Sequence, residues 1–262
     1  MRKIFALGCA LVIMLISGCA SDKGLPYQGD SAKFIYATGH NYMVDGNYTD
    51  AIEAFRSLMA QYPFEYYSQK GMLDLMYSYH QKGDDPMALA IAEQYLKLYP
   101  TNEERYYAYY MLGIVYSDNG RGFLQKYLPY DMTTHDPTGY KRAFYNFKQV
   151  VALAPDTPFA EDARRRMIYL KGVIAQYELN IAEFYLGKGA YVAAINRAKI
   201  VVKQYPKTTQ VEGALVVMLK AYQRLNLVKL VNSTSDVIKE NYPNNSYLTS
   251  LEKSKKRTTA RL

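Results

Sequence analysis

A helical hairpin that recurs along the chain limits what this sequence can fold into more than any other feature. Its clearest copy is GNYTDAIEAFRSLMAQYPFEYY, from Gly46 to Tyr67, in which a glycine ends one helical pattern and Pro63 ends the next. Between these two residues the apolar side chains recur at the i, i+3, i+4, i+7 spacing of one helix face. Copies of the pattern end at Pro63, Pro100, Pro155, Pro206 and Pro243. One hairpin cannot bury its apolar face alone, so the copies are expected to stack.

Aligning the copies on their closing prolines brings three further positions into register. Every first helix carries a tyrosine at one place: Tyr42, Tyr79, Tyr116, Tyr185 and Tyr222. Three residues earlier stand Gly39, Met76, Gly113, Ala182 and Leu219. The matching place in the second helix holds Ala51, Ala88, Ala143, Ala194 and Val231. Small residues at most of these positions let the two helices of a pair approach closely.

The turn inside each hairpin also follows a pattern. It carries Gly46, Gly83, Gly120, Gly189 and Asn226, residues that tolerate the left-handed conformation that ends a helix. The order L-G-x2-Y, A-x3-F and P over about 34 residues is the tetratricopeptide signature. The sequence therefore predicts an all-α fold, a tetratricopeptide-repeat solenoid of five helix pairs with one extended concave surface.

Two segments depart from the repeat. From Gly113 to Ala143 the chain advances 30 residues, against 12 from Gly39 to Ala51, which predicts an insertion at residues 121–140 in the third repeat. Such an insertion forms either part of a binding face or a plain surface loop. After the third repeat, near-helical apolar spacing without an internal proline predicts one long helix from about Pro158 to Leu186. This helix would connect repeats three and four.

The first 18 residues have the composition of a secretory leader. Arg2 and Lys3 precede IFALGCALVIMLI, an uncharged run too short to span a membrane. The sequence ISGC at 16–19 resembles the lipobox of bacterial lipoproteins, in which cleavage leaves the cysteine as an acylated N-terminus. We therefore predict lipidation at Cys19, and the alternative is an ordinary cysteine of the leader. Ala20 in place of an aspartate favours sorting to the outer membrane in the bacterial families that this segment resembles.

Removal of the leader would change both the cysteine content and the charge. Cys9 would be lost, which leaves Cys19 alone and excludes an internal disulfide or a cysteine-based metal site. The loss of Arg2 and Lys3 would lower the formal net charge from +8 to +6, and much of the excess lies at 248–262. Export argues against a nucleic-acid partner, whereas attraction to anionic lipid or to an acidic partner stays open.

These boundaries predict the organisation of a 262-residue chain whose 49% hydrophobic content is ample for a core. The predicted parts are a leader at 1–18, a lipidated tether at 19–30, repeats one to three at 31–157, the connecting helix with repeats four and five at 158–247, and a basic tail at 248–262.

Catalysis needs titratable groups that converge, and the sequence offers few. His40, His80 and His135 are the only histidines, and none has a partner at the spacing of a metal motif such as HExxH. Nucleophile elbows, phosphate loops and Cys-His sets do not occur. We therefore expect no enzymatic activity, no cofactor and no metal. The basic run 164–166 is interpreted as a solvated helix face.

The chain contains 28 tyrosines and no tryptophan, and five of the tyrosines are the repeated core residues. Tyr66, Tyr67 and Tyr107 instead cluster near the starts of repeats two and three, where inner-face side chains of such solenoids lie. Tyrosine rings give an extended peptide a large contact area at low entropic cost. These three residues are therefore predicted to line a groove for a substrate peptide. Ordinary packing between repeats is an equal alternative.

Several short motifs resemble one bacterial family. They are Gln61-Tyr-Pro-Phe-x-x-Tyr-Ser68, Leu73-Asp74-Leu75, Asp136-Pro137, Tyr169-Leu170-Lys171, Ala182-Glu183-x-Tyr185 and Gly189-Ala190-x-Val192-Ala193-x-x-Asn196-Arg197. Together with the lipobox and the repeats, they resemble the BamD family of lipoproteins in the machinery that assembles β-barrels in bacterial outer membranes. The similarity covers nearly the whole mature chain, and the last motif is the most specific.

The resemblance implies a non-enzymatic scaffold lipoprotein on the periplasmic face of the outer membrane. In that family, repeats one to three offer a pocket proposed to receive the C-terminal signal of unfolded outer-membrane proteins. The C-terminal repeats hold the POTRA domain nearest the barrel of BamA, and the arginine of the Asn-Arg pair belongs to that interface. Here the corresponding residues are Asn196 and Arg197, with Tyr191 where a larger aromatic ring is common. Other assembly lipoproteins are also implied as partners.

A different class of function fits the same repeats. A tetratricopeptide lipoprotein could instead organise a secretion, peptidoglycan or cell-division complex of the envelope. Depletion of the protein would separate the two hypotheses, because barrel proteins should disappear from the outer membrane only in the first.

Overall fold

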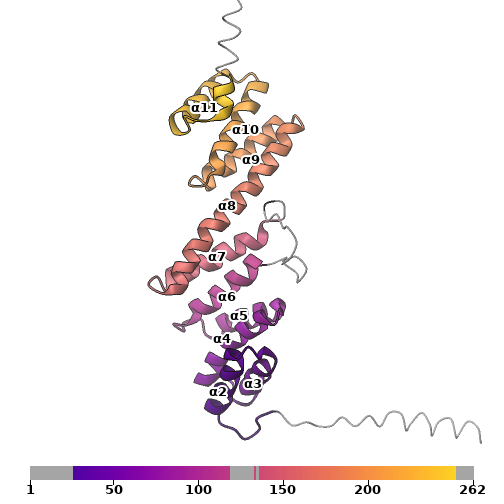
Figure 1. Ribbon diagram of the computed structural model, residues 1–262, viewed down its shortest axis with the longest axis vertical. Helices are drawn as coiled ribbons and strands as arrows, with labels where there is room; N and C mark the ends of the chain where they lie inside the picture. The colour runs from indigo at the N-terminus through magenta and orange to yellow at the C-terminus, as the bar shows by residue number, and fades with distance from the viewer. Residues whose placement is uncertain (1–25, 119–132, 134–135, 252–262) are drawn as a thin grey trace, which may run out of the picture. The chain divides into compact units, whose positions relative to one another are not determined.

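The computed structural model describes residues 26–118, 133 and 136–251. Cys19 with the predicted leader, most of the predicted insertion and the end of the basic tail lie outside these residues. All regular secondary structure in the described residues is helical, and Figure 1 labels the helices α2 to α11. The predicted all-α fold class is therefore confirmed.

The chain divides into two compact units, residues 1–83 and 84–262, called unit 1 and unit 2. Unit 1 contains α2 (Ala32–Val44), α3 (Tyr48–Gln61) and α4 (Tyr66–Gln81). Unit 2 contains α5 (Asp85–Leu98), α6 (Arg105–Asp118), α7 (Thr138–Leu153), α8 (Pro158–Gly187), α9 (Tyr191–Gln204), α10 (Gln210–Arg224) and α11 (Val228–Asn241). The second repeat thus has its first helix in unit 1 and its second helix in unit 2.

Unit 1 is a three-helix assembly in which α3 packs against α2 and α4, and α2 also contacts α4. Side-chain caps start the first two helices. The Oγ of Ser31 accepts the backbone N–H of Phe34 at 3.3 Å, and the Oδ1 of Asn47 accepts that of Asp50 at 3.4 Å. The apolar stripe of α3 then faces inward, with Phe55 and other residues fully buried.

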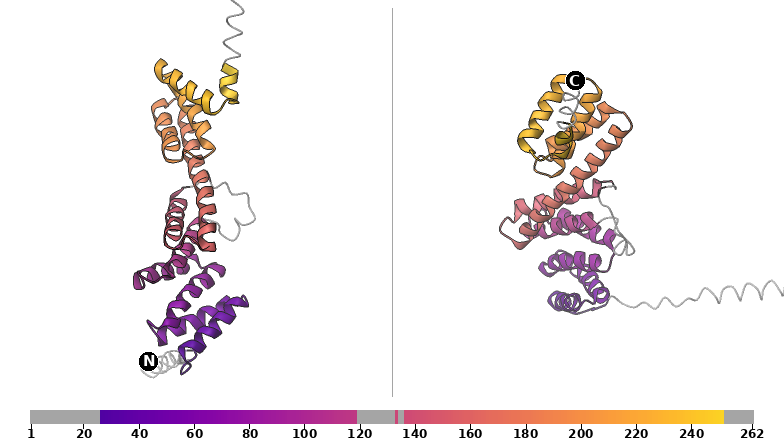
Figure 2. Two further views of the ribbon diagram at one scale, coloured as in Figure 1. Left: turned by 90° about the vertical axis from the view of Figure 1, so that its left-hand side faces the viewer. Right: turned by 45° about the horizontal axis from the view of Figure 1, so that its top comes forward.

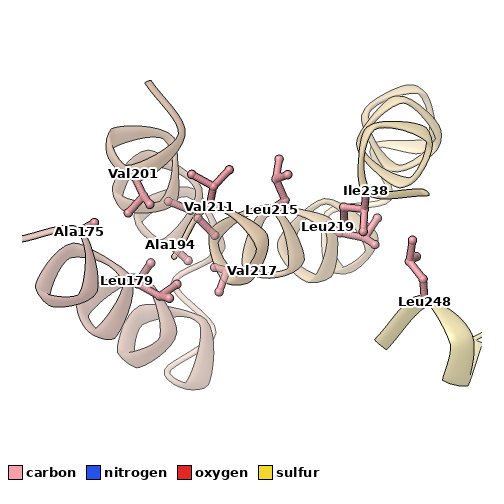
Figure 3. Packing of buried hydrophobic residues seen from close by; sticks show 13 residues of the cluster. Ala175, Leu179, Ala194, Val201, Val211, Leu215, Val217, Leu219, Ile238 and Leu248 are labelled. Atoms are coloured by element: carbon pink, nitrogen blue, oxygen red, sulfur yellow. The ribbon is translucent and has the colours of Figure 1, made fainter. Parts of the chain in front are cut away.

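In unit 2 each helix from α5 to α11 packs against the next one in the chain, as Figures 1 and 2 show for α9 and α10. Helix α8 is 30 residues long, which confirms the predicted long helix. Its N-terminal half contributes Ala163 and Leu170 to a core shared with α7. Its C-terminal half contributes Ala175 and Leu179 to a second core, which Figure 3 shows facing α9 and α10. One helix therefore belongs to two cores.

The repeated small residues act as the sequence predicted at two places. A Cβ atom added to Gly39 would lie 2.8 Å from Cε1 of Phe55, and one added to Gly113 would lie 2.5 Å from Cε1 of Phe147. Both rings are fully buried. In these two pairs, the first helix thus approaches its partner where a glycine leaves room for a phenylalanine ring.

The turn residues also adopt the predicted left-handed backbone. Gly46, Gly83 and Gly189 have φ of 78°, 83° and 74°, and Asn226 has φ of 55°. Gly120 lies outside the described residues.

Replacing Gly113 by alanine is expected to destabilise unit 2 by about 1–3 kcal/mol, because the new methyl group would overpack the buried ring of Phe147. Gly172 on α8 provides a matched control, since a Cβ added there meets nothing within 4 Å. Its replacement by alanine is expected to stabilise the protein by about 0.5–1 kcal/mol. Urea unfolding followed by circular dichroism measures both changes. An unchanged midpoint for Gly113→Ala would contradict the close approach of α6 and α7.

Candidate partner-binding site

The predicted partner-binding residues lie on α9, which follows a tight turn after α8. Gly189 allows that turn through its positive φ, and α9 then buries Ala194, Ala198 and Val201 against the second core of unit 2. The opposite face of the helix is open to solvent. Arg197 lies at the border of the two faces, with its side chain 40% exposed.

The guanidinium of Arg197 is held by a carboxylate from α8. Its Nη1 donates to Oε2 of Glu178 at 2.9 Å. The side chain of Glu178 is only 5% exposed, and it is the only charged residue among the buried ones that the structure describes. The Nζ of Lys141 on α7 lies 3.9 Å from its other oxygen. A buried carboxylate is thereby shared by cations from two neighbouring helices.

This arrangement fixes the position of Arg197. Removing one partner of a buried ion pair typically costs 3–5 kcal/mol, because an uncompensated charge stays in the interior. Arginine has five N–H donors in a rigid fork, and the contact with Glu178 uses Nη1. With two-fifths of its side chain exposed, Arg197 can bind a second carboxylate from outside while Glu178 keeps it in place.

The other two predicted residues on α9 have different surroundings. Tyr191 is partly buried and packs against a small cluster that contains Ile195 and Tyr222. Asn196 is exposed. Two large apolar side chains near the same turn are also exposed, Phe184 at 60% and Val192 at 63%. Exposed apolar side chains of this size are typical of contact surfaces when they occur together with an anchored charge.

The three tyrosines predicted to line a peptide groove are divided between the two units. In unit 1, Tyr66 is 60% exposed, and its ring lies edge-on to that of Tyr67 with centroids 5.4 Å apart. Tyr67 also packs against the ring of Tyr36. In unit 2, the ring of Tyr107 lies edge-on to that of Phe159, with the ring centroids 5.4 Å apart. Tyr66 is therefore the most accessible of the three.

Two arginines of the basic run 164–166 are paired within α8. The Nη1 of Arg165 lies 2.5 Å from Glu161, and the Nε of Arg166 lies 2.5 Å from Oδ2 of Asp162. Arg164 instead donates to the backbone carbonyl of Pro155 at 2.9 Å. The hydroxyl of Tyr110 on α6 also donates to Oδ2 of Asp162 at 2.9 Å. Burial alone would raise the pKa of Asp162, but the hydrogen bonds from Arg166 and Tyr110 outweigh it and lower that pKa below its usual value.

One hydrogen-bonded pair of titratable side chains was not predicted from the sequence. The Nδ1 of His40 on α2 lies 2.8 Å from Oδ2 of Asp74 on α4, although 34 residues separate them.

The described residues contain no group of three or more potential metal ligands. Within the same residues, none of the helices combines the length and apolar character needed to cross a bilayer.

Helix pairs with left-handed turn residues between them and small residues at their closest approach define a tetratricopeptide-repeat protein. A family described as outer membrane lipoprotein, YfiO, matches residues 28–238. The chain belongs to this family.

Proteins named outer membrane protein assembly factor BamD resemble this chain over almost their whole length. The protein from Vibrio cholerae is 34% identical over 91% of this chain and 99% of its own length. That from Haemophilus influenzae is 33% identical over 92% of each chain. That from Neisseria gonorrhoeae is 31% identical over 95% of this chain and 94% of its own. The predicted membership of the BamD family is thus confirmed.

Solved structures of tetratricopeptide-repeat proteins superpose only loosely on this chain. A protein from Parabacteroides merdae gives a TM-score of 0.41 at 12% identity, covering 83% of this chain and 69% of its own. The assignment of the fold therefore depends on the helix pairs and the repeated residues of this chain.

Replacing Asp162 by asparagine is expected to destabilise the protein by about 1–2 kcal/mol at neutral pH, because hydrogen bonds to a charged group would be lost. The folded state lowers the pKa of Asp162, so the stabilisation is present above the unfolded value near 3.9 and is lost as the pH falls through the folded value. Unfolding free energies between pH 7 and pH 3 should show the wild type and variant converging. Glu161→Gln, which breaks an exposed pair, serves as a control with a change under about 0.5 kcal/mol.

Proposed function

We propose that this protein is a lipid-anchored scaffold that holds a BamA-like barrel protein through its POTRA domain during outer-membrane protein assembly. The family assignment and the names of its relatives support the assembly role. The lipobox supports an anchor at Cys19, which would place the folded units on the periplasmic face of the outer membrane. The protein would act by binding alone, without catalysis or a cofactor.

The observation that carries the proposal is the geometry of Arg197. Its guanidinium is anchored by the buried Glu178 and remains partly exposed beside the open face of α9. An anchored arginine loses little conformational entropy when it binds a carboxylate in a second, bidentate contact. An acidic side chain on the POTRA domain is the complementary group. Asn196 and Tyr191 would contribute to the rim of this interface.

Two further groups of tyrosines would bind unfolded outer-membrane proteins. The proposed contacts are Tyr66 and Tyr67 in unit 1 and Tyr107 in unit 2, and Tyr66 is the most exposed of the three. The ammonium of Lys70 lies 4.9 Å from the centre of the Tyr66 ring, which adds a positive charge beside an aromatic surface. Such a surface suits an extended segment that carries aromatic side chains or a carboxylate. Other assembly lipoproteins are further proposed partners.

Replacing Arg197 by glutamine is expected to weaken binding to the POTRA domain about tenfold, because the charge is lost. An N–H donor and the ammonium of Lys141 remain near Glu178, so its carboxylate is not left alone. Arg197→Glu is a poorer choice, since it would place a second carboxylate beside a buried one. Lys199→Gln, which removes an exposed charge from the same helix, is the matched control with little change. Titration with the isolated POTRA domain and co-purification of the partner from cells measure the effect.

Equal affinity for Arg197→Gln and the wild type would remove Arg197 from the interface. Purification of the tagged protein without a BamA-like partner would contradict the proposed scaffold role itself. Depletion that leaves barrel proteins in the outer membrane would instead favour a scaffold for secretion, peptidoglycan or division machinery.

Replacing Tyr66 by alanine is expected to reduce binding of an unfolded outer-membrane protein several-fold and to leave the unfolding midpoint unchanged, because the ring is largely exposed. Tyr107→Ala is expected to lower the midpoint as well, since its ring packs on Phe159. Fluorescence anisotropy with a labelled C-terminal peptide from a barrel protein, beside thermal unfolding, distinguishes the two effects. Wild-type peptide affinity in Tyr66→Ala would exclude this surface.

A further inference from the structure

The segment that precedes α2 is fixed to unit 1. The backbone carbonyl of Pro26 accepts hydrogen bonds from the buried hydroxyl of Ser57 and from Nε2 of Gln61, the latter at 3.0 Å. Four residues later, the carbonyl of Asp30 accepts the hydroxyl of Tyr62 at 2.7 Å. Between these two points, the ring of Tyr27 packs against the apolar cluster between α2 and α3. The chain is therefore attached to α3 from Pro26 onward.

This attachment shortens the connection to the proposed lipid anchor. Only seven residue steps separate Cys19 from Pro26. A fully extended chain spans at most about 3.6 Å per residue, so the connection reaches roughly 25 Å. If Cys19 is acylated, as the proposed function requires, the surface of unit 1 around Pro26 is held close to the bilayer.

An open groove of about 500 Å³ begins at this attachment point. It is lined by Pro26, Thr49, Ile52, Glu53, Arg56, Ser57, Ala60 and Lys82. Arg56 and Lys82 are both exposed, and Glu53 is the single acidic residue of the lining. The groove thus presents two cations at the place where the chain leaves toward the membrane.

We propose that this groove is the membrane-facing side of unit 1, and that Arg56 and Lys82 bind the phosphates of lipid headgroups. A guanidinium and an ammonium are the side chains best suited to phosphate oxygens. Two exposed cations are too few to hold a free protein at a bilayer, since each contributes only about fivefold to binding of an anionic surface. A short tether raises the effective local concentration to the millimolar range, so that weak contacts of this kind are occupied.

The contact would orient the anchored protein. A lipid anchor alone leaves a protein free to rotate about its attachment, whereas a second contact near the anchor restricts that rotation. Unit 1 would then keep its groove toward the headgroups and turn its remaining surface toward the periplasm.

The test uses the full mature lipoprotein in vesicles of phosphatidylethanolamine and phosphatidylglycerol. Acylation occupies Cys19, so one engineered cysteine is the only free thiol of the mature chain. A fluorophore is attached at Thr49→Cys inside the groove or at Tyr66→Cys, which lies on α4 of the same unit and outside the groove lining. Quenching by lipids with a nitroxide on the headgroup reports proximity to the membrane surface.

We expect quenching at position 49 to exceed that at position 66 several-fold. The double change Arg56→Gln and Lys82→Gln should reduce the quenching at position 49 severalfold, and so should a long glycine-serine insert between Gly24 and Leu25. Lys33→Gln, an exposed cation of α2 that does not line the groove, serves as the control and should have no effect.

Equal quenching at the two positions in a correctly acylated protein would overturn the inference and leave the proposed partner binding untouched. Quenching at position 49 that survives both the double change and the insert would also overturn it, because the two cations and the short tether would then be irrelevant. The mass of the N-terminal peptide is measured first. An unacylated Cys19 would contradict the lipid anchor in the proposed function and the membrane contact together.

Discussion

Unit 2 depends on a single helix that belongs to two hydrophobic cores. The N-terminal half of α8 packs with α7, and its C-terminal half packs with α9 and α10. A 30-residue helix is about 45 Å long, so two cores that lie apart can share one rigid element. Because α8 is one continuous helix, it fixes the two cores of unit 2 relative to each other.

The same helix also carries the only buried charge in the described residues. Glu178 lies just beyond the boundary between the two cores, where Lys141 of α7 and Arg197 of α9 reach its two oxygens. Burial makes this carboxylate costly unless cations accompany it, and that requirement fixes Arg197 on the border of an open helix face. Folding and the proposed binding to a partner therefore use one ion pair, while the proposed membrane contact of unit 1 lies at the groove beside Pro26.

Much of the fold follows from local sequence signals. The glycines and asparagine at the turns, the closing prolines and the apolar periodicity predict the helices, and the small residues Gly113 and Ala143 predict a close approach of α6 and α7. The structure adds that the ring of Phe147 fills the space that Gly113 leaves. Only part of the candidate site could be predicted from the sequence. Arg197 was predicted from a motif, but its partner Glu178 lies 19 residues away on another helix, and no local pattern marks that pair.

The sequence by itself determined which segments are helices, where each one ends and which positions face a core, because these properties depend on neighbours within about one turn. Only the tertiary structure decided which charges meet, which tyrosines stay exposed and where the N-terminal segment attaches. Those outcomes depend on side chains that are distant in the chain, as with His40 and Asp74 or Pro26 and Ser57. Their contacts exist only after the helices have packed and excluded water from between them.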